Sequence, residues 1–135
     1  MQPEIPVNQS PRVLIVEDDY LVAWQVQDAL KEAGLQTSGI AATADEVLRS
    51  AESRRPALVL MDVRLGGQSD GVVTALELYR VYGIRCIFAT ANYDADIRRR
   101  AQAAEPLGWL AKPYTMSSLV TLVRKALSDL HAASQ

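Results

Sequence analysis

Five side chains that could take part in chemistry stand at the ends of short apolar runs in this 135-residue sequence. They are Glu17, Asp18, Asp62, Thr90 and Lys112. Three carboxylates that lie close together repel one another, so some of their pKa values should rise unless a cation enters. A hard divalent cation with oxygen ligands removes that conflict. Mg²⁺ fits best, with Mn²⁺ as the alternative.

Lys112 and Thr90 add groups that favour an anion at the same place. An ammonium group suits a phosphoryl group electrostatically, and a hydroxyl group can donate a hydrogen bond to it. A carboxylate such as Asp62, flanked by a metal ion, an ammonium group and a hydroxyl group, is equipped to form an aspartyl phosphate. The catalysis would consist mostly of positioning and charge neutralisation.

Each of these residues, taken alone, has a plainer interpretation. Glu17 and the acidic residues after it could cap the following helix. Lys112 could be a solvated lysine, and Thr90 could be an ordinary residue at the end of a strand. The combination is far more specific than any one member, because the residue types match at the ends of the first, third, fourth and fifth expected strands.

These residues can act together only if the surrounding elements bring them to one place. Strands are expected at about 13–17, 35–41, 57–62, 84–90 and 107–111, and helices at about 22–33, 43–54, 70–82, 94–104 and 115–131. Continuous apolar strands are typical of a parallel sheet covered on both faces, so the expected fold class is α/β, a doubly wound (βα)5 domain. Ligands of such sheets bind outside the carboxyl ends of the strands.

Composition narrows the function classes. The chain is expected to be one domain at 12–132, after a flexible tail at 1–11 with three prolines among polar residues. A net charge of -2 argues against a nucleic-acid-binding surface. The single cysteine, Cys86, excludes an internal disulfide. No secretory signal and no apolar run long enough for a membrane helix are present, so a cytoplasmic protein without a nucleic-acid or membrane partner is expected.

Four motifs of the chain resemble the receiver domain of bacterial response regulators, over about residues 12–130. They are Val-Leu-Ile-Val-Glu-Asp-Asp, Leu-Val-Leu-Met-Asp-Val-Arg-Leu, Phe-Ala-Thr-Ala and Leu-Ala-Lys-Pro-Tyr. The resemblance implies a flavodoxin-like strand order, 2-1-3-4-5, with Asp62 as the phosphoacceptor. It also implies that Mg²⁺ is held by Glu17, Asp18, Asp62 and the backbone carbonyl of Arg64.

The same resemblance implies roles for residues near the last two strands. Thr90 would be the switch hydroxyl, and Lys112 would hold the phosphoryl group. Ala91 and Trp109 would belong to the same phosphoryl-binding and switching set. The bond between Lys112 and Pro113 is expected to be cis, which would help to aim Lys112 at the site.

Two departures from the family pattern concern the way that phosphorylation is read and reversed. Trp109 stands where the family usually has Tyr or Phe as a rotameric switch, and it could instead be a half-buried anchor for the last strand. The segment 88–93 is similar to the Phe-Ala-Thr-Gly-x-Gly-Tyr signature of a single-domain receiver subgroup, with Ala91 in place of a Gly. The resemblance also implies that Arg64 and Asn92 tune dephosphorylation.

The resemblance implies a phosphoacceptor that catalyses its own phosphorylation and dephosphorylation. Its donor would be a histidine kinase or a histidine phosphotransfer protein. A downstream protein partner would bind the face made by the elements at 94–104, 107–111 and 115–131. The chain could act alone by protein contact, or it could be a piece of a larger protein. Trp24 could be a partner contact or packing, and the arginines at 98–100 could be a solvated helix face or a docking patch for an acidic partner.

Three other functions compete with this one. A Mg²⁺-dependent phosphatase with an Asp nucleophile would place a second acid two residues after Asp62, where Arg64 stands. A nucleotide or flavin binder would have a first turn rich in Gly, Ser or Thr, and not the anion-repelling acids that start at Glu17. A receiver that only binds partners without phosphorylation would not need the five-residue set.

Overall fold

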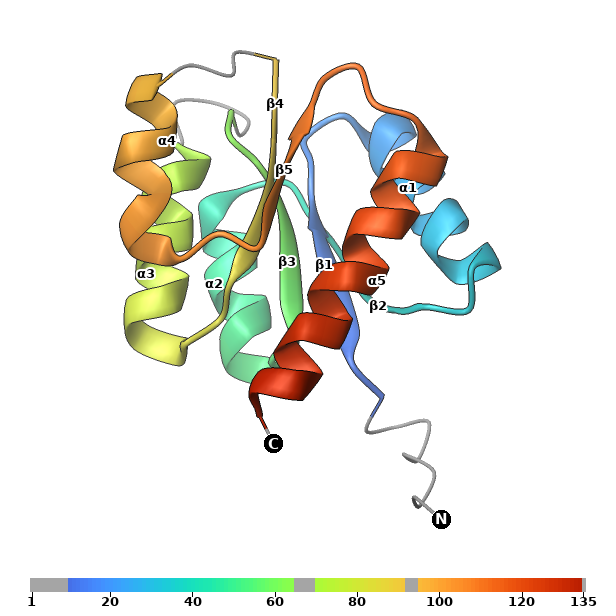
Figure 1. Cartoon of the computed structure of the whole chain (residues 1–135), viewed down its shortest axis with the longest axis horizontal. Helices are drawn as coiled ribbons and strands as arrows, with labels where there is room; N and C mark the ends of the chain where they lie inside the picture. The colour runs from blue at the N-terminus through green and yellow to red at the C-terminus, as the bar shows by residue number, and fades with distance from the viewer. Residues whose placement is uncertain (1–9, 65–69, 92–94, 135) are drawn as a thin grey trace.

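The computed structural model describes residues 10–64, 70–91 and 95–134, in which strands and helices alternate (Figure 1). The strands are β1 (Arg12–Val16), β2 (Gln36–Ala41), β3 (Leu58–Asp62), β4 (Cys86–Thr90) and β5 (Gly108–Ala111). The helices are α1 (Tyr20–Glu32), α2 (Ala44–Ser53), α3 (Gly71–Tyr82), α4 (Ala95–Ala101), the 3₁₀ helix η2 (Gln102–Ala104) and α5 (Met116–Ala133). The tail expected at residues 1–11 lies almost wholly outside the described ranges.

The strands form one five-stranded sheet in the order β2-β1-β3-β4-β5, and every pair of neighbours is parallel. This confirms the doubly wound α/β class and the predicted strand order. Parallel pairing directs all the carboxyl ends to one edge of the sheet. The residues that follow β1, β3, β4 and β5 therefore lie at the same edge.

The core has two halves, one on each face of the sheet. Figure 1 shows α1 and α5 over one face and α2, α3 and α4 over the other. Alternate residues of β1 divide between these halves: Leu14 and Val16 pack beneath α2 and α3, and Val13 and Ile15 pack beneath α1 and α5. Every residue of β3 and β4 is buried, which explains their continuous apolar sequence.

Some boundaries differ from the sequence prediction. Strand β4 begins at Cys86 and not at Ile84, because the Ile84 N–H donates to the Leu78 carbonyl and helps to close the end of α3. Gly83, with φ of 69°, makes that turn. The fourth helix is α-helical only to Ala101 and continues as a 3₁₀ turn. No helix in the described ranges has the length and apolar character needed to cross a membrane.

Candidate phosphoacceptor and metal site

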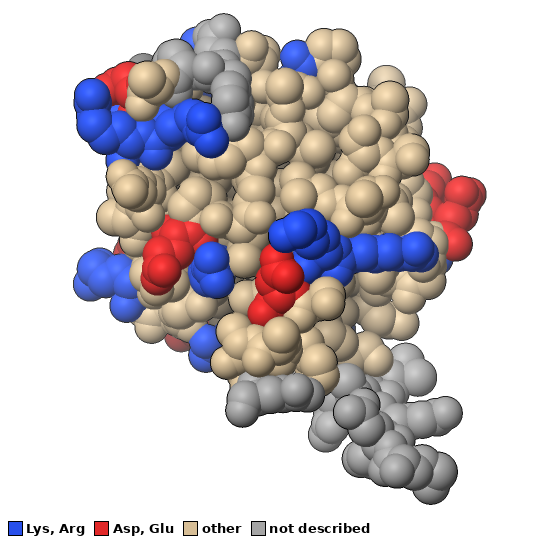
Figure 2. Space-filling view, in the orientation of Figure 1, with Lys and Arg blue, Asp and Glu red and all other residues tan. Residues whose placement is uncertain are grey.

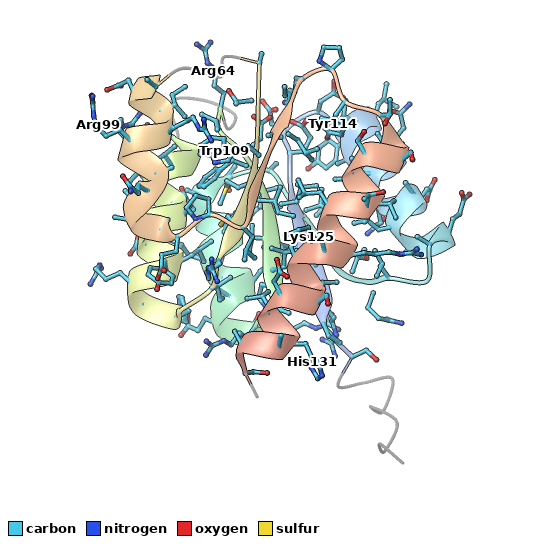
Figure 3. All side chains as sticks on the ribbon, in the orientation of Figure 1. Arg64, Arg99, Trp109, Tyr114, Lys125 and His131 are labelled. Atoms are coloured by element: carbon cyan, nitrogen blue, oxygen red, sulfur yellow. The ribbon has the colours of Figure 1, made fainter. Side chains whose placement is uncertain are left out.

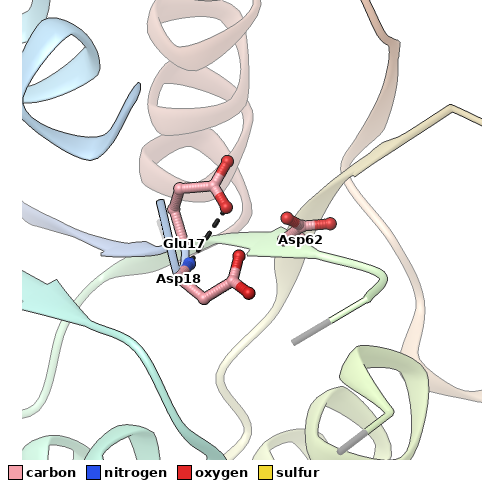
Figure 4. Close-up of side chains that lie close together, drawn as sticks. All are labelled: Glu17, Asp18 and Asp62. Atoms are coloured by element: carbon pink, nitrogen blue, oxygen red, sulfur yellow. Dashed lines mark hydrogen bonds between the residues drawn. The ribbon is translucent and has the colours of Figure 1, made fainter. Parts of the chain in front are cut away.

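Three carboxylates meet where β1 and β3 end (Figure 4). Glu17 follows β1 directly, Asp62 ends β3, and these two strands are neighbours in the sheet. One oxygen each from Glu17, Asp18 and Asp62 lie within 4.8 Å of one another. Glu17 and Asp62 are buried and Asp18 is exposed, so the cluster is open to solvent on the side of Asp18.

The three acidic residues after β1 serve two purposes: one caps α1 and the other two belong to the carboxylate cluster. The Glu17 carboxylate accepts a hydrogen bond of 2.9 Å from the backbone N–H of Asp18 (Figure 4). Asp19 caps α1, since its carboxylate accepts from the N–H groups of Leu21 and Val22. The helix cap is therefore Asp19, and Glu17 and Asp18 belong to the carboxylate cluster.

Lys112 reaches this cluster from the far end of the sheet edge. Its Nζ atom lies 2.9 Å from Oδ2 of Asp62 and 3.5 Å from Oε1 of Glu17. The backbone N–H of Lys112 donates a hydrogen bond of 2.9 Å to the Thr90 carbonyl, which ties the end of β5 to the end of β4. The peptide bond between Lys112 and Pro113 is cis.

The electrostatics of the cluster show that one ammonium group does not neutralise it. The pKa of Glu17 is raised to about 7, mostly by burial and then by the hydrogen bond and charge of the nearby Asp62 carboxylate, against the opposing charge of Lys112. For Lys112, burial favours the neutral form, but the hydrogen bond and charge of Asp62 and the charge of Glu17 outweigh it and raise its pKa. An all-oxygen donor set with unbalanced negative charge suits a hard divalent cation such as Mg²⁺.

The other predicted site residues lie around this centre. Thr90 is buried at the end of β4, next to Ala91, which is exposed. Arg64 is exposed; its N–H donates to Oδ1 of Asp62 over 3.1 Å, and its side chain projects above the sheet edge in Figure 3. Asn92, and with it the rest of the subgroup signature, lies outside the described residues.

Trp109 is half-buried and packed against its neighbours. Its ring stacks on Phe88 of β4, with centroids 4.9 Å apart and an angle of 26° between the planes. The Arg98 guanidinium group of α4 lies over the indole, 5.9 Å from its centroid. Trp109 thus touches both the buried strand that leads to Thr90 and the helix beside it.

The structure adds residues that the sequence reasoning missed. A hollow of about 480 Å³ opens beside Glu17 and Lys112. Its lining also includes Ala91 and Pro113, which the sequence had indicated, and four residues that it had not: Val22, Gln25, Tyr114 and Met116. Tyr114 lies near the upper ends of α1 and α5 in Figure 3, and its burial raises the pKa of its phenol. The sequence position of Tyr114, two residues after Lys112, could have indicated that it lies near the site.

The comparisons with known proteins agree with this geometry. Residues 13–124 match the model of the response regulator receiver domain. The transcriptional regulatory protein PdtaR of Mycobacterium tuberculosis is 32% identical over 117 residues, which cover 87% of this chain and 57% of PdtaR. The chain spans about half the length of the curated relatives that it matches first.

Two solved structures are similar over nearly the whole domain. The signal receiver domain of a modulated diguanylate cyclase from Desulfovibrio desulfuricans has a TM-score of 0.81 and 33% identity, covering 92% of this chain and 98% of that one. A CheY-like receiver domain protein from Methanospirillum hungatei has a TM-score of 0.85 with the same coverage. Its identity is 23%, so it supports the fold alone.

Proposed function

Because the chain belongs to the response regulator receiver domain family, we propose that Asp62 is its phosphoacceptor and takes a phosphoryl group from a phosphohistidine. The contact of the Lys112 ammonium group with Asp62, at 2.9 Å, carries this proposal. It brings a positive charge to the buried carboxylate at the end of β3. Glu17 and Asp18, within 4.8 Å, supply the metal-binding carboxylates beside it.

The chemistry is a transfer of one phosphoryl group between two nucleophiles. An Asp62 oxygen forms a bond to phosphorus as the phosphorus–nitrogen bond of the donor breaks, and the bonding electrons leave with the imidazole nitrogen. Lys112 faces the oxygens of the incoming group and offsets their charge. Bound Mg²⁺, held by Glu17, Asp18, Asp62 and the Arg64 carbonyl, would supply further neutralisation of the phosphoryl oxygens.

Hydrolysis reverses the modification at the same centre. Water attacks phosphorus, the Asp62 oxygen leaves as a carboxylate, and inorganic phosphate and a proton are released. Arg64 follows Asp62 closely and is exposed, so its side chain can cover the route of water to the phosphoryl group. We assign to Arg64, and to Asn92, the tuning of the phosphoryl lifetime.

An apolar patch on α1 supports a docking role for the donor protein. Tyr20, Leu21 and Trp24 are 59%, 72% and 60% exposed. They belong to the same helix as Val22 and Gln25, which line the hollow beside Lys112. A donor that brings its phosphohistidine to Asp62 must cover the surface next to this hollow, and exposed Trp and Tyr are frequent anchors of protein interfaces. We assign the histidine kinase or phosphotransfer protein to this patch.

The output surface is the face made by α4, β5 and α5, which Figure 2 views directly. Much of the upper part of this face carries neither acidic nor basic side chains, and basic residues gather at one border, over α4. Phosphorylation changes the charge beside Thr90, and Trp109 links β4 to α4 through its contacts with Phe88 and Arg98. A shift of these elements would alter the face that a downstream protein meets in the cytoplasm.

A phosphoryl mimic tests this function without a partner protein. Beryllofluoride and Mg²⁺ are added to a Trp24→Phe variant, in which Trp109 is the sole tryptophan. Saturable change of the Trp109 fluorescence is expected, and it should vanish when Asp62 is also replaced by Ala. A response that survives Asp62→Ala would refute the assignment of Asp62.

A further inference from the structure

The start of α3 packs closely against the backbone at the end of β3, which carries the phosphoacceptor Asp62. The Gly71 N–H donates a hydrogen bond of 2.8 Å to the Val63 carbonyl. Arg64 and Asp70 form an isolated antiparallel bridge between their backbones. Arg64, whose carbonyl is the proposed metal ligand, is therefore paired with Asp70, the N-cap residue of α3.

Gly71 shows how close this approach is. A Cβ atom at this position would lie 2.1 Å from the carbonyl oxygen of Asp62 and 3.0 Å from the Cα atom of Val63. Both contacts are with backbone atoms, which cannot turn aside as the end of a flexible side chain can. A displacement of the α3 start toward β3 would therefore press on the backbone of Asp62.

Asp70 joins this packed junction to α4. One of its carboxylate oxygens accepts a hydrogen bond of 2.8 Å from the Val72 N–H and so caps α3. The other oxygen forms an ion pair with the guanidinium group of Arg100 on α4. The neighbouring Arg99 pairs instead with Asp96 inside α4, so its ion pair does not reach the junction.

We propose that Asp70 and Arg100 are positioning residues that couple α4 to the metal and phosphoryl site. The inference rests on the proposed function, because it concerns the ligand set around Asp62. An α4 helix held by this ion pair fixes Asp70, and Asp70 fixes the backbone bridge to Arg64. By linkage, occupation of the site must then bias the position of α4 to the same extent.

The expected effect is modest, because the two side chains of the pair are 41% and 36% exposed. Ion pairs of this exposure change an equilibrium constant by about two- to fivefold. Isothermal titration with Mg²⁺ alone is the primary measurement. Amide hydrogen exchange at Gly71, by NMR, reports the junction independently of any phosphorylation.

Two variants remove the ion pair without removing the helix cap. Arg100→Gln loses the charge on α4, and Asp70→Asn keeps an oxygen that can accept from Val72. Each should weaken Mg²⁺ binding about two- to fivefold and speed exchange of the Gly71 amide. The double variant should be no weaker than either single one, and Arg100→Lys should restore part of the loss. Arg99→Gln is the matched control and should leave both readouts unchanged.

The outcomes separate this inference from the function on which it rests. If the wild-type protein binds Mg²⁺ and forms the Asp62 phosphate, but Arg100→Gln and Arg99→Gln behave alike, the coupling is refuted and the function stands. Additive losses in the double variant would also refute it, because independent effects do not act through one ion pair. Failure of the wild-type protein to bind Mg²⁺ would overturn both.

Discussion

The Lys112 ammonium group donates a hydrogen bond of 2.9 Å to the Asp62 carboxylate, from a position fifty residues further along the chain. The parallel sheet makes this contact possible, because it brings the ends of β3 and β5 to one edge. Lys112 also lies 3.5 Å from Glu17 and so stands between two buried carboxylates. This arrangement leaves a net negative centre that is poised to take a cation and a phosphoryl group.

Loss of the Lys112 charge should slow phosphorylation strongly. Lys112→Ala removes the group that faces the incoming phosphoryl oxygens, and removal of one such stabilising donor typically costs about a hundredfold in rate. The rate of Asp62 phosphorylation by acetyl phosphate, followed by intact mass, checks this. Lys112→Arg keeps the charge with a different geometry and should retain more of the rate. Equal rates for wild type and Lys112→Ala would contradict the role given to Lys112.

The stability of the metal-free protein should fall as pH rises toward neutrality. The pKa of Glu17 is about 7 in the folded protein and 4.5 in the unfolded reference, so the folded state holds the extra proton between these values. The contribution of Glu17 to the free energy of unfolding is thus full below pH 4.5 and is lost as pH passes through 7. Between pH 5.5 and pH 8 the loss is of the order of 2 kcal/mol.

Urea denaturation in EDTA at pH 5.5 and pH 8 measures this loss. Glu17→Gln cannot titrate, so its stability should change less between the two pH values. Added Mg²⁺ should reduce the wild-type loss, because it binds the charged carboxylates of the folded protein. An identical pH dependence in wild type and Glu17→Gln would show that Glu17 does not titrate in this range.

The apolar patch on α1 should matter only for a protein donor. Trp24→Ala should reduce phosphotransfer from a phosphorylated histidine protein by about tenfold or more, since exposed aromatic anchors dominate many interfaces. The rate with acetyl phosphate should stay the same, because this small donor needs no docking surface. Val81→Ala is the control, since Val81 is 50% exposed on α3, on the other face of the sheet. A loss with both donors would place the effect of Trp24 on folding or chemistry instead.

Gly71→Ala should destabilise the protein by about 3 kcal/mol or more, because its methyl group would meet the Asp62 backbone at 2.1 Å. Gly108→Ala should cost less, about 1 kcal/mol, since its methyl group would meet the movable side chain of Leu122. The free energy of unfolding in urea compares the two. Similar losses would mean that the junction between β3 and α3 can relax.

Local pattern was enough to predict the sheet and the residues at its edge. The apolar runs that end at Asp62 and Thr90 are buried strands, and parallel pairing follows from their burial on both faces. Since a parallel sheet aligns its carboxyl ends, the five candidate residues share one edge, and the strand order then decides which of them are neighbours. The strand order came from the family resemblance and is confirmed by the structure.

Contacts between distant segments were beyond the reach of the same reasoning. Nothing in the sequence near Asp70 indicates its ion pair with Arg100, which lies thirty residues away. The direction of Trp109 also depends on packing, because an indole at this position can point inward or outward until Phe88 and Arg98 are placed around it. The start of β4 was placed too early because Ile84 is apolar, although its N–H belongs to the closing turn of α3.

Intact mass spectrometry after incubation with Mg²⁺ and acetyl phosphate tests whether Asp62 is the phosphoacceptor. The wild-type protein should gain the mass of one phosphoryl group, and hydroxylamine should remove it, as expected for an acyl phosphate. Asp62→Asn, which keeps the size of the side chain, should gain nothing, whereas Asp96→Asn, at an exposed acid on α4, should gain the same mass as wild type. No gain in the wild-type protein, or a gain that persists in Asp62→Asn, would contradict the assignment.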